Sequence, residues 1–225
     1  MQEHHLPVQR TARFHTLGPW NGAVGQLWFV LHGHSQLAAP FLQEFAALDD
    51  GTRLVIAPEA LSRFYLETSV RGGHGPRIGA TWMTREDRHA DIGDNIHYLE
   101  RLAAHAVSEL ATRPADVRVL GFSQGGSTAA RWVAAGGIRP RELVLWGSLL
   151  PEDVMLDAAN PVWREVTISF VRGSEDKLIP PALLEAQFAK VQAAGIASRV
   201  LTFEGGHRID AETLLSLAQS PVSPR

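Results

Sequence analysis

The stretch from 117 to 127 constrains the fold more than any other part of the chain. A largely apolar, β-branched run leads into a Gly-x-Ser-x-Gly pattern centred on Ser123, and apolar residues then recur at helical spacing, at Ala129, Ala130, Trp132 and Val133. A strand, a tight turn and a helix in this order are the context that a nucleophile elbow requires. Such a turn strains its middle residue, so Gly121 and Gly125 on either side meet the need for almost no side chain.

Apolar runs typical of buried strands alternate along the chain with stretches of helical periodicity. The strands are predicted at 26–31, 53–57, 117–120, 142–146, 166–171 and 199–203. Helices are predicted at 40–48, at 92–110, directly after Ser123, at 180–194 and at 210–217. This alternation predicts an α/β fold with a mostly parallel central sheet and helices on both faces. In such sheets, chemistry gathers at the carboxyl ends of the strands.

Two parts of the chain follow other patterns. Weak alternation over 10–16, followed by turn residues at 18–22, predicts a short antiparallel hairpin that opens the fold. From Glu59 to Met83 the periodicity fades, and a loop of this length is often functional or mobile. The segment 84–87 then resembles a capping box for the next helix, with Asp87 in place of the usual Glu or Gln.

Length and terminal composition predict a single domain over 1–225, with 1–9 and 219–225 as flexible tails. The N-terminus lacks the basic and apolar regions of a signal peptide, and no apolar run approaches the length of a membrane span. We therefore expect a cytoplasmic protein without stable membrane insertion, which is either a monomer or a homodimer.

Charge and cysteine content limit the partners and the chemistry. The net charge of -3, from 21 basic and 24 acidic residues, offers no basic surface for nucleic acid. Small neutral molecules are therefore the simpler partners. The chain has no cysteine, which excludes disulfides, thiolate metal sites and a cysteine nucleophile.

Three polar residues follow predicted strands in the order Ser123, Asp176, His207, which is the chain order of the α/β-hydrolase triad. A serine hydroxyl needs a base to take its proton and a third group to hold that base in the right tautomer. His207 and Asp176 fit those two roles. Glu175 is the rival acid, and a solvated loop position remains the alternative for both Asp176 and His207.

A nucleophile of this kind also needs preorganised donors for the substrate oxyanion, commonly two backbone amides. Gln124 supplies the amide directly after Ser123, and His34 supplies one from the loop after the 26–31 strand. His34 would then act through its backbone. An alternative interpretation takes His32 and His34 as a metal-binding pair, although no Asp-His follows nearby to complete such a cluster.

The chain resembles the phospholipase/carboxylesterase family of small α/β-hydrolases, which includes acyl-protein thioesterases. The resemblance rests on five stretches: Leu31-His32-Gly33, Gly121-Phe122-Ser123-Gln124-Gly125, Ser148-Leu149-Leu150-Pro151, Gly173 to Pro180, and Gly206-His207. It implies a compact hydrolase without a large lid, which acts on small-molecule esters or thioesters and needs no cofactor and no metal.

The sequence departs from the family pattern around the expected substrate site. After His32-Gly33 it has His34-Ser35-Gln36, where relatives commonly carry a Gly and an acidic residue. Candidate substrate-binding residues are Trp82, Leu149 and His74, with core packing the alternative for Trp82 and a solvated loop the alternative for His74.

These observations predict a serine hydrolase that cleaves short- to medium-chain acyl esters through an acyl-enzyme. Thioesterase, lysophospholipase or peptidase activity would use the same triad, so these alternatives stay open. A ligand-binding module that keeps the fold without turnover is the alternative from another class.

Overall fold

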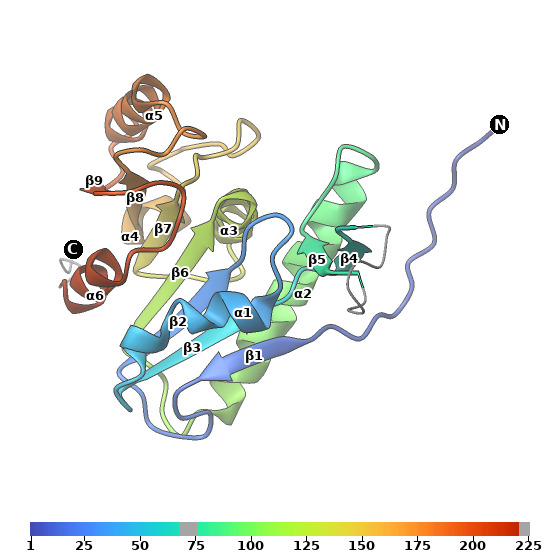
Figure 1. Cartoon of the computed structure of the whole chain (residues 1–225), viewed down its shortest axis with the longest axis horizontal. Coiled ribbons are helices and arrows are strands. Elements are labelled where there is room, and N and C mark those ends of the chain that lie inside the picture. Colours follow the sequence, from blue (N-terminus) through green and yellow to red (C-terminus); the bar gives the residue numbers. More distant parts are fainter. Residues whose placement is uncertain (68–75, 221–225) are drawn as a thin grey trace.

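A seven-stranded sheet forms the centre of the molecule in the computed structural model, which describes residues 1–67 and 76–220. The strand order is β1-β3-β2-β6-β7-β8-β9, and each neighbouring pair is parallel except β1 with β3. Figure 1 shows the sheet with its helices. The strands are β1 (Phe14–Leu17), β2 (Gln26–Leu31), β3 (Arg53–Pro58), β6 (Asp116–Phe122), β7 (Glu142–Trp146), β8 (Thr167–Gly173) and β9 (Ser198–Phe203). The predicted mostly parallel sheet is confirmed.

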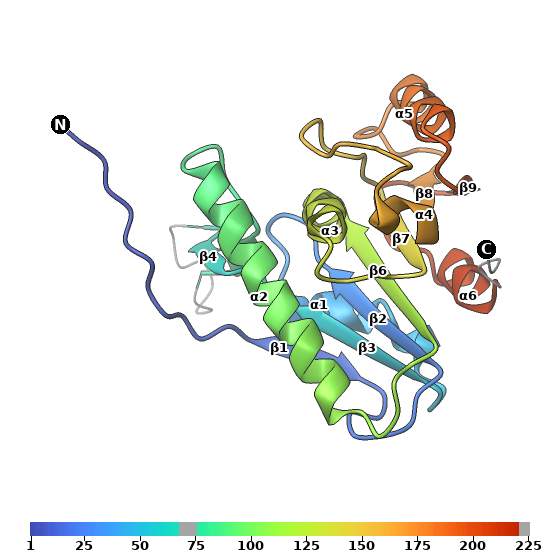
Figure 2. The same ribbon diagram turned by 180° about the vertical axis from the view of Figure 1, so that it is seen from behind.

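Helices cover both faces of this sheet. One face carries α2 (Arg88–Glu109), α3 (Gln124–Ala135), α4 (Pro161–Glu165) and α5 (Pro181–Ala193). The other carries α1 (Ala38–Gln43), the short 3-10 helix η1 (Ala46–Leu48) and α6 (Ala211–Gln219). Figure 1 is seen from the side of α1, and Figure 2 shows α2 and α3 lying across the opposite face. The predicted helices on both faces are confirmed.

The central strands are buried on both faces because their side chains alternate between two apolar cores. In β2, Leu27 and Phe29 join the core under α2 and α3, whereas Trp28 and Val30 join the core under α1 and α6. All four side chains have an exposed fraction of 0%. This explains why the strand is a continuous apolar run in the sequence and shows no alternation.

The predicted N-terminal hairpin is wrong in its pairing. The first strand, β1, does form, but it pairs antiparallel with β3 and lies at the edge of the sheet. β2 is flanked on both sides, by β3 and by β6, so it has no free edge to offer β1. The turn residues at 18–22 therefore connect strands that are not neighbours.

The stretch from Glu59 to Met83 contains a two-stranded antiparallel sheet, β4 (Ser62–Tyr65) with β5 (Ile78–Thr81), which the fading periodicity did not reveal. The predicted capping box is wrong. Asp87 precedes α2 with a left-handed backbone (φ 46°) and makes no side-chain cap, while the Thr84 hydroxyl donates to the Glu86 carbonyl. The helix α4 was also not predicted from the sequence.

The two ends of the chain differ from each other. Residues before β1 carry no helix or strand. At the other end Gln219 is still the last residue of α6, so the predicted tail begins too early, and 221–225 lie outside the described residues. Among the helices of the described ranges, none is long and apolar enough to cross a membrane.

Candidate active site

Ser123 lies at the turn between β6 and α3 with a backbone that non-glycine residues seldom adopt, at φ 53° and ψ -121°. The two flanking glycines have no room for a side chain. A Cβ on Gly121 would lie 2.3 Å from the Gly125 carbonyl oxygen, and one on Gly125 would lie 2.3 Å from the Leu31 carbonyl oxygen. The predicted strand, tight turn and helix are therefore all present, and the strain is at the residue where the pattern places it.

Asp176 and His207 form a hydrogen-bonded pair at the carboxyl ends of β8 and β9. The His207 Nδ1 atom lies 2.7 Å from the Asp176 Oδ2 atom, and Asp176 is 3% exposed. The other carboxylate oxygen accepts from the Leu178 amide at 2.8 Å. The His207 ring packs against Phe122, the residue before Ser123, with 4.7 Å between ring centroids. Glu175, the rival acid, has an exposed side chain.

The second ring nitrogen of His207, Nε2, has no hydrogen-bond partner in the described part of the protein. An Nδ1–H that donates to Asp176 leaves Nε2 as a hydrogen-bond acceptor. This Nε2 atom is buried and has no hydrogen-bond partner among the described residues. The structure thus brings Asp176 and His207 together beside the elbow, and no hydrogen bond joins the His207 Nε2 atom to Ser123.

Gly147 is a residue of this site that the sequence analysis missed. It follows β7 with a φ of 54°, and a Cβ there would lie 2.7 Å from His207 Cε1 and 3.3 Å from Asp176 Oδ2. Only glycine leaves space for the Asp176–His207 pair at this position. The sequence does have a glycine directly after the 142–146 strand. A single glycine after a strand is too common to mark that position as part of an active site.

The loop after β2 lies directly against the elbow. A Cβ on Gly33 would lie 3.2 Å from the Ser123 Cβ atom, so the backbone leading to the His34 amide runs beside Ser123. On the other side, Gln124 is the first residue of α3, where a backbone amide has no partner within the helix. The two backbone amides predicted to bind the oxyanion, those of Gln124 and His34, therefore belong to segments that border Ser123.

The side chain of Gln124 has a second role that the sequence did not indicate. Its Oε1 atom accepts from the Trp82 amide at 3.0 Å, and its Nε2 atom donates to the Met83 carbonyl at 2.8 Å. The Thr81 hydroxyl also hydrogen-bonds to this amide group. The residue after Ser123 thus fastens the end of β5 to the start of α3.

His32 and His34 differ in environment and do not form a metal-binding pair. His32 is 0% exposed, with Nδ1 bound to the Gly33 carbonyl at 2.8 Å and Nε2 bound to the Ala60 amide at 3.1 Å. Both of its nitrogens are therefore occupied by protein groups. His34 is exposed and stacks on Phe64 of β4, with ring centroids 5.5 Å apart. Burial lowers the pKa of His32, which keeps its ring neutral.

The three candidate substrate-binding residues are placed differently. Trp82 is 1% exposed, and its indole Nε1 donates to the His32 carbonyl at 2.8 Å. These are the contacts of a core residue, which was the alternative role for Trp82. Leu149 is partly buried and packs against the core on the α3 face of the sheet. His74 lies outside the described residues.

A buried carboxylate, Glu59, anchors the loops on the β3 side of the site. It is 1% exposed, and Arg13 and Arg63 donate to it at 2.6 Å and 3.0 Å. Burial raises the pKa of Glu59, but the hydrogen bonds from Arg13 and then Arg63 outweigh burial and hold the pKa below its usual value. Glu59 therefore stays ionised and also accepts from the Ala38 amide at the start of α1.

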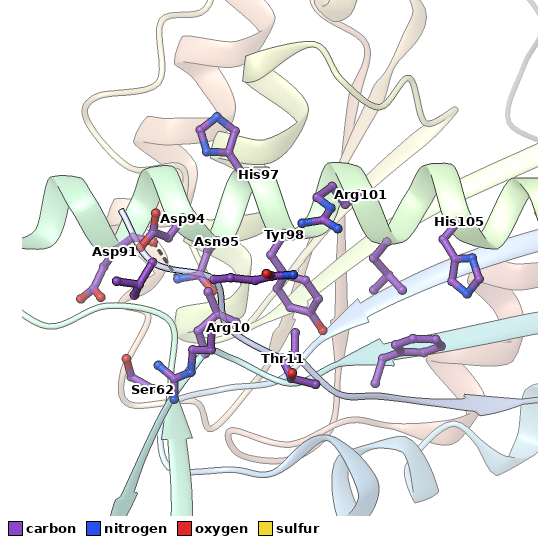
Figure 3. A pocket seen from close by; sticks show the side chains of 16 residues that line it. Arg10, Thr11, Ser62, Asp91, Asp94, Asn95, His97, Tyr98, Arg101 and His105 are labelled. Atoms are coloured by element: carbon purple, nitrogen blue, oxygen red, sulfur yellow. Dashed lines mark hydrogen bonds between the residues drawn. The ribbon is translucent and has the colours of Figure 1, made fainter. Parts of the chain in front are cut away.

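A cavity lies apart from the Ser123, Asp176 and His207 side chains, none of which lines it. It measures about 610 Å³ and lies between residues 8–14, α2 and β4 (Figure 3). Charged side chains of both signs line it, including Arg10, Asp94 and Arg101. None of the residues that the sequence nominated for chemistry borders this cavity.

Comparison with known proteins identifies the fold. No protein-family model and no curated protein matches the sequence. Solved structures do match: acyl-protein thioesterase 2 from Zea mays (TM-score 0.68, 18% identity, 93% of this chain and 97% of that one), a carboxylesterase from Mesorhizobium loti (0.67, 14%, 93% and 95%) and esterase PE8 (0.64, 22%, 93% and 99%). At these identities the likeness shows the fold alone, and this chain has the α/β-hydrolase fold.

Proposed function

We propose that the protein is a serine hydrolase that cleaves carboxylic esters, with Ser123 as nucleophile, His207 as general base and Asp176 as the group that orients His207. The observation that carries this proposal is the Asp176–His207 hydrogen bond of 2.7 Å, packed against Phe122 beside a strained Ser123. It supplies the base in the correct tautomer, with a free Nε2, next to the candidate nucleophile.

In the acylation step, His207 Nε2 takes the proton from the Ser123 hydroxyl while Oγ attacks the ester carbonyl carbon. The carbonyl oxygen becomes an oxyanion, which the backbone amides of Gln124 and His34 stabilise. The C–O bond to the alcohol then breaks, and the alcohol leaves with the proton that His207 held. In deacylation, water attacks the acyl-enzyme by the same route and releases the acid.

Short- to medium-chain acyl esters are the proposed substrates. The structural neighbours bear names of carboxylesterases, esterases and an acyl-protein thioesterase, so thioesters and lysophospholipids belong to the same proposal as alternatives. A panel of p-nitrophenyl esters of increasing chain length, with matched thioesters and a lysophospholipid, distinguishes these substrate classes by their kcat/KM values.

A fluorophosphonate probe tests the nucleophile. We expect one covalent adduct per chain, located on Ser123 by peptide mass spectrometry, and no adduct on a Ser123→Ala variant. A matched control is Ser127→Ala, which changes a serine within α3 and leaves Ser123 in place. If the folded wild-type protein takes no adduct on Ser123, the proposal is wrong.

One observation favours a second candidate, a ligand-binding module without turnover: no hydrogen bond joins Ser123 to His207. Catalytic hydrogen bonds are often long in free enzymes and tighten when substrate binds, so the missing bond is compatible with the hydrolase as well. Stoichiometric binding of an ester analogue without turnover of any p-nitrophenyl ester would support the module.

A further inference from the structure

The His32 ring has a single tautomer that its partners impose. The Ala60 amide donates to Nε2 at 3.1 Å, and a backbone N–H can donate only to an unprotonated nitrogen. The proton of the neutral ring must therefore be on Nδ1, from which it is donated to the Gly33 carbonyl at 2.8 Å. The His32 backbone is held as well, because its carbonyl accepts from the Trp82 indole.

The carbonyl that His32 holds and the amide nominated for the oxyanion belong to the same peptide unit. In a planar trans peptide, the carbonyl of one residue and the N–H of the next point in opposite directions. The Gly33 carbonyl accepts from His32 Nδ1 and also from the Gln36 amide at 3.3 Å. Fixing the direction of this carbonyl therefore fixes the opposite direction of the His34 N–H.

The backbone amide next to that of His34, on Gly33, already has a hydrogen-bond partner within the loop. The Gly33 amide donates to the Gln36 side-chain oxygen at 2.7 Å. No hydrogen bond that the structure gives within the described ranges uses the His34 amide. The loop thus satisfies the Gly33 and Gln36 amides and the Gly33 carbonyl internally, and the His34 amide is the group left beside Ser123.

We propose that His32 is a positioning residue of the oxyanion site: its neutral ring holds the Gly33 carbonyl and thereby keeps the His34 amide turned toward the substrate oxygen. This inference rests on the proposed serine hydrolase function. It assigns a role to His32 that does not require contact with substrate.

Two variants separate the two nitrogens of His32. In His32→Asn, the side-chain amide nitrogen takes the place of Nδ1 and can still donate to the Gly33 carbonyl. In His32→Gln, the side-chain oxygen takes the place of Nε2 and can still accept from the Ala60 amide, but the donor to Gly33 is lost. Both variants remove the ring, so loss of packing affects them alike.

We expect His32→Asn to keep kcat within about threefold of wild type. His32→Gln should lower kcat by roughly 10- to 100-fold with KM little changed, because removal of an oxyanion donor itself costs about 100- to 1000-fold. Affinity for a trifluoromethyl ketone, which forms an oxyanion adduct with the serine, should fall with kcat in His32→Gln. Equal kcat losses in the two variants would overturn the inference.

Two further measurements keep the inference testable on its own. If wild type shows neither turnover nor a Ser123 adduct, the proposed function fails, and this inference fails with it; if wild type is active and the two variants match, only the inference fails. Should either variant not fold, nitrogen NMR of histidine-labelled wild type decides. We expect the neutral His32 ring at pH 8 to carry its proton on Nδ1, and an Nε2–H signal at that pH would contradict the proposal.

Discussion

Polar groups at the amino ends of the parallel strands differ in their pairing from those beside Ser123 at the carboxyl ends. These two sides of the sheet are called the amino edge and the carboxyl edge below. At the amino edge, Arg118 is 1% exposed and donates to Asp116 and Glu142, and also to the carbonyls of Leu217 and Ser220 at the end of α6. At the carboxyl edge, His207 has one paired nitrogen and one buried nitrogen without a partner. Around Arg118 the amino edge pairs its charges internally, whereas beside Ser123 the carboxyl edge leaves the His207 Nε2 atom as a free acceptor.

We therefore expect residues at one end of the strands to determine stability and residues at the other end to determine activity. A charge buried in an internal network is expensive to strip of its partner, so changes at the amino edge should act on unfolding. An unpaired acceptor beside a strained Ser123 contributes little to folding, so changes at the carboxyl edge should act on turnover. Each of the following changes tests this separation.

The largest effect is expected for Asp176→Asn. The asparagine oxygen can still accept from the Leu178 amide, but its NH₂ group would face His207 Nδ1 and force the proton onto Nε2, so His207 could no longer accept from Ser123. We expect kcat for a p-nitrophenyl ester to fall by about 10⁴-fold. The unfolding free energy in urea should stay close to that of wild type.

The matched control for this change is Glu175→Gln, one residue earlier and exposed. It should leave kcat within about twofold of wild type, since Glu175 lies outside the histidine pair and a surface substitution of this kind has little effect. If Glu175→Gln lost turnover and Asp176→Asn kept it, our assignment of Asp176 as the acid that orients His207 would be wrong.

At the amino edge, Arg118→Met should have the second largest effect. The substitution leaves Glu142 and Asp116 buried with fewer donors, and breaking a buried ion pair from one side costs about 3–5 kcal/mol. We expect this loss in the unfolding free energy measured in urea, with kcat per folded molecule unchanged.

Arg199→Met is the matched control, because Arg199 also pairs with Glu142 but is 32% exposed. Replacement of Arg199 leaves Arg118 in place. We expect the unfolding free energy to fall by roughly 1 kcal/mol, as for a partly solvated ion pair. An Arg118→Met protein that is as stable as wild type but has lost turnover would reverse the assignment of the two edges.

The pH dependence of stability should reveal the buried neutral histidine at the carboxyl edge. The pKa of His32 is lowered in the folded protein by burial, so the unfolded chain takes up a proton near pH 6.5 that the folded chain does not. The unfolding free energy should therefore fall as the pH decreases below this value, by at most about 1.4 kcal/mol per pH unit. Urea unfolding of wild type and His32→Asn from pH 7 to 5 isolates this contribution, and identical slopes would contradict it.

The smallest effect is expected for Ser35→Gly in the loop that carries the His34 amide. Ser35 has a φ of 67°, which glycine adopts without strain. Relief of strain should exceed the added entropy of the unfolded chain by roughly 0.5 kcal/mol. Thermal unfolding should show a small rise in Tm, while Ser35→Ala, which keeps the strain, should show none.

Sequence patterns were informative where one local cause decides the structure. The buried strands follow from continuous apolar runs, and the elbow follows from two glycines that have no room for a Cβ. The Asp210 side chain caps α6 by accepting from the Thr213 amide at 3.1 Å, at the start of the helix predicted for 210–217. Each of these features leaves a pattern among residues that are close together in the chain, so the sequence shows it.

Other features depend on contacts between distant segments, and the sequence could not show them. The pairing of β1 depends on which strand edge is free, and only the assembled sheet decides that. The partners of Gln124 come from residues more than 40 positions earlier. The need for glycine at Gly147 arises from the His207 and Asp176 side chains, which come from two later strands.

The hydrogen bonds of the Gln124 side chain restrict how this protein could change its substrate by exchange of loops. They join the start of α3 to Thr81, Trp82 and Met83, so the base of the β4–β5 hairpin and the nucleophile turn are one mechanical unit. A new hairpin sequence grafted between Glu59 and Thr81 would have to keep this attachment. Trp82 and Met83 take part through backbone atoms and Thr81 through its hydroxyl, so such a graft needs the same backbone path after β5 and a hydroxyl at position 81.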